Sequence, residues 1–196
     1  MQSNLPMKDF IINLLKDKLP KSYLYHNHEH TLYVLEKAEE IGRNEGCSER
    51  ELELLEAAAL WHDTGYTKTY TNHEEESCLL ARQYLPEFGF SAIDIDKVCG
   101  MIMATKIPQS PKNKLEEILA DADLEYLGTA SFEIKSDSLY NELHTINPSL
   151  SEINWNQMEI SFLQKHHYFT RFCQKNREHI KQMHLNKLLL RQMGDE

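Results

Sequence analysis

The chain has 196 residues and a formal net charge of −10 at pH 7, with 41% hydrophobic and 27% charged residues. This composition is typical of a globular protein with one sizeable core. It disfavours general binding to the nucleic acid backbone, and no apolar run reaches the about 18 residues that would indicate a membrane span. We therefore expect neither a nucleic acid partner nor a membrane partner.

The four cysteines, at positions 47, 78, 99 and 173, include no Cys-x-x-Cys pair. This is typical of small apolar side chains in a reducing compartment, and the amino terminus lacks the pattern of a secretory signal, so we expect a cytoplasmic protein. The segment 165–191 contains seven Lys or Arg and one acid, Glu178. It either helps to hold an anionic substrate or forms a solvated face that pairs with the acidic remainder of the chain.

Glycine and proline are scarce, at 7 and 6 residues, and strand-like alternation is hard to find. Apolar periodicity and breakers predict helices over residues 5–19, 27–41, 48–62, 73–85, 91–107, 114–127 and 131–145. A helical region from residue 151 is expected to break near Asn176. Ser48 followed by Glu51 predicts a capping box, and Asn72 is expected to cap the helix that begins at His73.

The sequence thus predicts an all-α fold of roughly eight or nine helices around one core. We expect a single domain over residues 1–196. Its functional centre is expected within residues 25–128, and residues 151–196 form a carboxy-terminal helical extension.

The second predicted helix carries a histidine on its buried face. His30, Val34, Ala38 and Ile41 follow one another at steps of four, four and three residues, which places His30 in line with core residues. His26 lies one turn before it, towards the start of the helix.

The third predicted helix ends in an apolar run, 54–60, that is followed by His62 and Asp63. Helical steps back from His62 reach Ala58 and Leu55, so its imidazole faces the core. A carboxylate at the edge of an apolar interior is costly unless a positive charge pairs with it, and a metal ion would supply that charge and bind the imidazole. Taken alone, the pair is better explained by a hydrogen-bonded core histidine followed by an aspartate at the helix end, and the rest of the chain is what favours a metal site.

The sixth predicted helix contains two aspartates. Asp123 lies four residues from both Leu119 and Leu127 on an apolar stripe, whereas Asp121 has glutamates at the same offsets. Asp123 is therefore the better candidate for a metal ligand. Asp121 is expected at the helix surface or supporting the ligands, and it remains equally well explained as an ordinary solvated acid.

These residues lie in four segments that together resemble the HD superfamily of metal-dependent phosphohydrolases. The segments are Tyr25-His26-Asn27-His28-Glu29-His30-Thr31, Trp61-His62-Asp63-Thr64-Gly65-Tyr66, Asn72-His73-Glu74-Glu75-Glu76-Ser77 and Asp121-Ala122-Asp123-Leu124-Glu125-Tyr126-Leu127-Gly128. The resemblance implies that His30, His62, Asp63 and Asp123 hold one divalent cation. It also implies that the protein hydrolyses a phosphate ester of a small, nucleotide-like substrate. By position in the cyclic-nucleotide phosphodiesterase branch, His26 is expected to protonate the leaving oxygen.

Two imidazoles and two carboxylates suit Mn, Fe, Ni, Co or Zn better than Mg, although the pattern does not choose among these metals. The cation would activate a water for attack on phosphorus, with His26 as general acid and Asp63 as an essential carboxylate.

Members of the superfamily that hold two metals generally have further histidines. His73 fits one such position, but residues 104–106 contain no histidine. We therefore expect at most one tight metal, with His73 and Lys106 facing the substrate. A plain solvated loop lysine is an equally good interpretation of Lys106. The alternative function is a non-catalytic HD module that keeps the metal and senses a nucleotide.

Overall fold

The computed structural model describes residues 6–194, and in that range it contains ten α-helices, three short 3-10 helices and no β-strand. The α-helices are α1 (Met7–Lys18), α2 (His28–Asn44), α3 (Glu49–Trp61), α4 (His73–Tyr84), α5 (Ala92–Ala104), α6 (Lys114–Asp123), α7 (Phe132–Ile146), α8 (Glu152–Lys165), α9 (Arg171–Asn176) and α10 (Glu178–Gly194). The 3-10 helices are η1 (Thr64–Thr67), η2 (Leu85–Phe88) and η3 (Glu125–Gly128). The predicted all-α fold is confirmed. None of the described helices is both long and apolar enough to cross a membrane.

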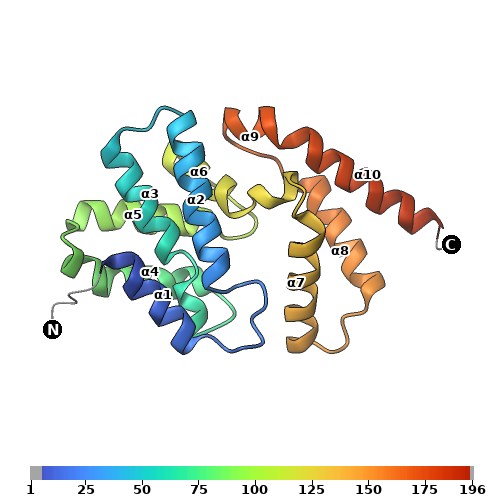
Figure 1. The fold of residues 1–196 in the computed structure, drawn as a ribbon, viewed down its shortest axis with the longest axis horizontal. Helices are drawn as coiled ribbons and strands as arrows, with labels where there is room; N and C mark the ends of the chain where they lie inside the picture. Colours follow the sequence, from blue (N-terminus) through green and yellow to red (C-terminus); the bar gives the residue numbers. More distant parts are fainter. Residues whose placement is uncertain (1–5, 195–196) are drawn as a thin grey trace.

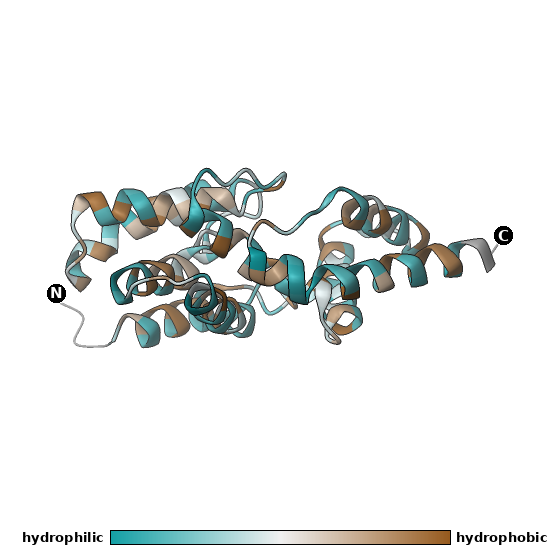
Figure 2. Ribbon diagram, turned by 90° about the horizontal axis from the view of Figure 1, so that it is seen from above, coloured by the Kyte–Doolittle hydropathy of each residue, from teal (hydrophilic) through white to brown (hydrophobic). Residues whose placement is uncertain are grey.

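The helices form two lobes that lie side by side along the long axis of the molecule (Figures 1 and 2). Helices α1 to α6 make up the first lobe, and α7, α8 and α10 make up the second. The buried apolar side chains also form two clusters rather than the one core that the sequence suggested. The first is centred on α3, in which residues 57–61 are all buried, and the second gathers around Leu163. The single-domain organisation stays a prediction.

Several helix starts follow the capping chemistry of the sequence, but the start of α4 does not. The predicted capping box of Ser48 and Glu51 is present, and Ser91 with Asp94 forms a second one at the start of α5. Asn72 does not cap α4: its backbone adopts a left-handed conformation with φ 55°, and its side chain makes no capping hydrogen bond. That amide instead accepts a hydrogen bond from the Lys106 ammonium, at 3.1 Å.

Asp121 is fully buried, so the expectation that it lies at the helix surface is wrong. Its carboxylate accepts hydrogen bonds from the backbone N–H groups of Phe169 and Thr170, both at about 2.8–2.9 Å, and from the Thr170 hydroxyl at 2.6 Å. Burial raises the pKa of Asp121 to about 6, although these hydrogen bonds act to lower it. The segment between α8 and α9 thus covers a face of α6 that local periodicity marks as polar.

Glu125 ties the two lobes together in the same way. It is fully buried, forms an ion pair with Arg177 and accepts a hydrogen bond from the Tyr33 hydroxyl of α2. Close approach of the backbone at Gly128 permits this arrangement, because a Cβ there would lie 2.5 Å from the Arg177 carbonyl oxygen. The end of η3 and the residue before α10 are therefore packed against each other without room for a side chain.

The Asp121→Ala substitution is expected to lower the free energy of unfolding by about 3 kcal/mol, because it leaves three buried donors without their acceptor. Urea denaturation followed by circular dichroism measures this change. Asp137→Ala, at an exposed carboxylate on α7, is the matched control and is expected to change stability by less than about 0.5 kcal/mol. Equal stabilities of the two variants would contradict the anchoring role of Asp121.

Candidate metal centre

Three helices bring two imidazoles and one carboxylate to a single point. His30 comes from the first turn of α2, His62 from the end of α3 and Asp123 from the end of α6. One potential ligand atom from each lies within 4.8 Å of the other two. The Nε2 atom of His30 is 3.0 Å from Oδ1 of Asp123 and 3.5 Å from Nε2 of His62. The structure thus brings together the three residues that apolar periodicity selected.

Asp63 completes this cluster. Its Oδ2 atom lies 3.2 Å from His62 Nε2 and 3.5 Å from His30 Nε2. Within the described residues this buried oxygen has no hydrogen-bond partner. A buried carboxylate oxygen without a donor is costly, and a cation among these four side chains would remove that cost.

The orientation of the His62 ring also fits a metal ligand. Its Nδ1 atom lies 2.7 Å from the carbonyl oxygen of Ala59, which can only accept a hydrogen bond. Nδ1 therefore carries the proton, so in the neutral ring Nε2 points a bare lone pair at the cluster. The four side chains offer two nitrogen and two oxygen donors, which fits a divalent transition metal.

Charge points to the same conclusion. Burial lowers the pKa of His62, but the carboxylates of Asp63 and Asp123 raise it by more, to about 9. Burial raises the pKa of Asp63, but the charge of the neighbouring His62 holds it well below its usual value. The two carboxylates thus require a positive charge at this point, which either a proton or a metal ion supplies.

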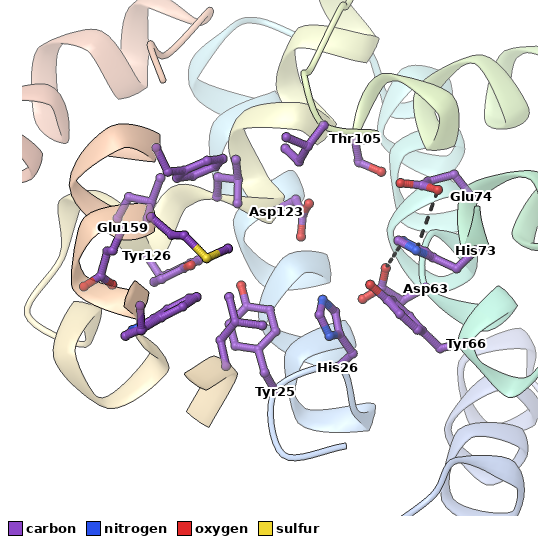
Figure 3. A pocket seen from close by; sticks show the side chains of 17 residues that line it. Tyr25, His26, Asp63, Tyr66, His73, Glu74, Thr105, Asp123, Tyr126 and Glu159 are labelled. Atoms are coloured by element: carbon purple, nitrogen blue, oxygen red, sulfur yellow. Dashed lines mark ion pairs between the residues drawn. The ribbon is translucent and has the colours of Figure 1, made fainter. Parts of the chain in front are cut away.

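A 280 Å³ cavity opens beside the cluster, and Figure 3 shows Asp63, Asp123 and His26 around it. Its walls include Leu124 and Tyr126 from the end of α6 and η3. Further apolar walls come from the second lobe, namely Leu139, Trp155, Met158 and Phe162. In the described part of the chain, no lysine or arginine lines this cavity.

His26 lines the cavity and is held by Glu142, a residue that the sequence analysis missed. The Nδ1 atom of His26 lies 2.5 Å from Oε1 of Glu142, which is fully buried. Glu142 also accepts hydrogen bonds from the backbone N–H groups of Tyr25 and His26, at 2.8 and 3.0 Å. Burial raises the pKa of Glu142, but the hydrogen bond and charge of His26 outweigh it and lower that pKa overall. A buried ionised carboxylate thus fixes the His26 ring.

His73 reaches the site from the first turn of α4. Its Nε2 atom lies 3.4 Å from Oδ1 of Asp63, and its ring stacks on Tyr66 with 3.8 Å between the ring centroids (Figure 3). Gly65 makes this approach possible, because a Cβ there would lie 1.9 Å from the His73 carbonyl oxygen. His73, which was expected to face the substrate, therefore lies on the cavity wall.

Lys106 is not brought into the site. Its ammonium pairs with Glu75 and donates to Asn72, and it is absent from the cavity lining. Glu75 lies on the outer side of the first turn of α4 and draws the lysine away from the cluster. Of the seven residues predicted from the sequence to form the site, the structure gathers His26, His30, His62, Asp63, His73 and Asp123.

Comparisons with known proteins agree with this arrangement. The model of the HD domain family matches residues 27–125. Among solved structures, a predicted HD superfamily hydrolase from an uncultured Thermotogales bacterium has a similar fold, with a TM-score of 0.55 and 23% sequence identity. The similarity covers 83% of this chain and 92% of that one. No curated protein matches the chain. Since the family model spans half of the sequence and includes all four residues of the cluster, the chain belongs to the HD domain family of metal-dependent phosphohydrolases.

Proposed function

We propose that the protein hydrolyses a phosphate ester of a small, nucleotide-like substrate with the help of one divalent cation held by His30, His62, Asp63 and Asp123. The observation that carries this proposal is the partnerless Oδ2 atom of Asp63, which lies among two imidazoles at the wall of a 280 Å³ cavity. A purely structural cluster would instead satisfy that oxygen with a donor.

When bound, the cation would offset the charge of the phosphoryl group and favour deprotonation of a water. The protein's own residues perform the rest of the reaction. Water oxygen forms a bond to phosphorus while the bond from phosphorus to the leaving oxygen breaks. A proton on His26 Nε2 passes to that leaving oxygen, while Glu142 holds Nδ1 and keeps the ring in orientation. Asp63 contacts the His73 imidazole through Oδ1, while its Oδ2 atom faces His30 and His62.

The cavity walls favour a substrate with one compact charged end and an organic remainder. No cationic side chain among the described residues lines the cavity, so the bound cation, His26 and His73 must balance the charge of the phosphate. Tyr126, Trp155 and Phe162 supply aromatic surfaces farther from the cluster, and such surfaces suit a nucleoside-like group. In this proposal Lys106 contacts the substrate only after it leaves Glu75.

Metal content provides the first test. The purified protein is expected to contain about one divalent transition metal per chain by elemental analysis. The substitutions His62→Ala and Asp123→Ala are expected to remove this metal and to reduce phosphate release by at least about 100-fold, with unchanged circular dichroism. His179→Ala, which alters an exposed histidine on α10, is the control. Metal-dependent turnover that persists in both cluster variants would rule out this site. Nucleotide binding without turnover under every metal tested would instead favour a sensor module.

The Glu142→Gln substitution tests the proton donor. It keeps the shape of the side chain but removes the charge that faces His26, so we expect kcat for an alkyl phosphate ester to fall by about 100-fold. For a nitrophenyl ester, whose leaving oxygen needs no proton, the loss is expected to be much smaller. Metal content serves as the control for intact ligands. Equal losses on the two esters would contradict the assignment of His26 as general acid.

A further inference from the structure

A second cavity, of 170 Å³, lies beyond two residues that also wall the first cavity, Ile107 and Phe162. It is formed by residues 107–109, before α6, by Phe162 and the exposed Lys165 near the end of α8, and by His166, His167 and Phe169 after that helix. Phe162 and Phe169 supply aromatic walls. None of the metal-cluster residues lines it, so it is a separate compartment next to the candidate active site.

Gln109 lines this cavity and carries a buried hydrogen-bond acceptor. Its Nε2 atom donates to the carbonyl oxygen of Ala120, at 2.7 Å. Because a carbonyl oxygen can only accept, this contact fixes the orientation of the side-chain amide. The other amide atom, Oε1, is buried and has no partner among the residues the structure describes.

His166 presents a buried donor. Its Nδ1 atom lies 3.3 Å from the Lys181 ammonium, which can only donate, so the ring proton is on Nε2. Lys181 is itself fully buried and is held by the His166 carbonyl oxygen at 2.6 Å and by Glu178 at 2.9 Å. In the described range the Nε2 atom of His166 has no partner either. Burial and the charges of Lys181 and His167 lower the pKa of His166 to about 3, so the ring is neutral at physiological pH.

The volume of this cavity is much larger than one bridging water would fill. A water needs about 10–15 Å³ of such volume, whereas the cavity measures 170 Å³. Its aromatic walls are fixed in place: Phe162 stacks on His166, and Asp121 accepts a hydrogen bond from the backbone N–H of Phe169. A rigid donor and a rigid acceptor between aromatic side chains match a planar ligand that carries the complementary groups.

We propose that this cavity binds an uncharged planar group in which an N–H donor lies beside a carbonyl or ring-nitrogen acceptor, the edge of a nucleobase or of a carboxamide. The ligand N–H pairs with Gln109 Oε1, and the ligand acceptor pairs with the N–H of His166. This group is either the organic part of the substrate or a separate small effector. Only the former depends on the proposed phosphohydrolase function.

Calorimetric titration of the full chain with uracil, cytosine, adenine and benzamide tests the proposal without any turnover. We expect at least one of these probes to bind with a Kd below about 1 mM. Methylation of uracil at its imide nitrogen removes the donor and is expected to weaken the binding of uracil by at least about tenfold. Failure of all four probes to bind would overturn the proposal, as would equal affinity for uracil and its methylated form where uracil binds.

Substitutions at His166 locate the binding. His166→Phe is expected to weaken the best probe by at least about tenfold, whereas His166→Gln, which supplies an amide N–H near the place of Nε2, is expected to retain most of the affinity. His179→Phe, the same change at an exposed histidine, is the control. Unchanged affinity in a folded His166→Phe variant would place the probe elsewhere and overturn the proposal.

Competition then identifies the source of the ligand. If the free probe competes with a phosphate ester of the same group, and His166→Phe raises KM for that ester, the cavity holds the organic part of the substrate. If the probe binds while KM stays unchanged, the cavity holds an effector. Absence of turnover with every ester would count against the proposed function and leave the binding result standing.

Discussion

The enclosure of three carboxylates within five residues, with Asp121 and Glu125 fully buried and Asp123 partly buried, is the constraint on which the rest of the structure depends. Asp121 and Glu125 lie four residues apart, whereas Asp123, between them, leaves the end of α6 on another face. Each meets different partners: the backbone of 169–170, the His30 imidazole, and Arg177 with Tyr33. Because an unpaired buried charge costs several kcal/mol, the fold holds only when all three sets of partners are in place.

This constraint explains why the candidate site belongs to both lobes. The ligand cluster lies entirely within the region that the HD domain model matches, residues 27–125. Four apolar wall residues of the cavity, Leu139, Trp155, Met158 and Phe162, and the carboxylate that holds His26 come from residues 139–162, outside that region. Asp121 and Glu125 fix the second lobe against the first, so they also fix those walls. In the proposed function, the metal chemistry would therefore reside in the family segment and the choice of substrate in the helices that follow it.

The parts of the site that follow from sequence are those set by local periodicity. His30, His62 and Asp123 each lie on the apolar stripe of their own helix, and a buried polar residue on such a stripe needs a partner. Local periodicity does not predict the burial of Asp121 and Glu142. Their donors come from Thr170, 49 residues away, and from His26, 116 residues away. Local spacing marks both acids as polar and solvated, and only the packing of the lobes reveals that they are enclosed. The same limit applies to Lys106, whose position follows from Glu75 on a different helix.

The buried side chains of the two cavities differ in charge, and this difference fits the two-part recognition that we propose. Around the first cavity lie the Asp63 and Asp123 carboxylates, His26 with its Glu142 partner, and His73, a set that suits a phosphate and a cation. The buried groups of the second cavity, Gln109 and a neutral His166, can pair with an uncharged edge, and the lysine on its lining, Lys165, is solvent-exposed. Ile107 and Phe162 wall both compartments. A molecule with an ionic phosphate and a neutral planar part could therefore place its phosphate in the first cavity and its planar part in the second. Ile107 and Phe162 would lie between the two parts.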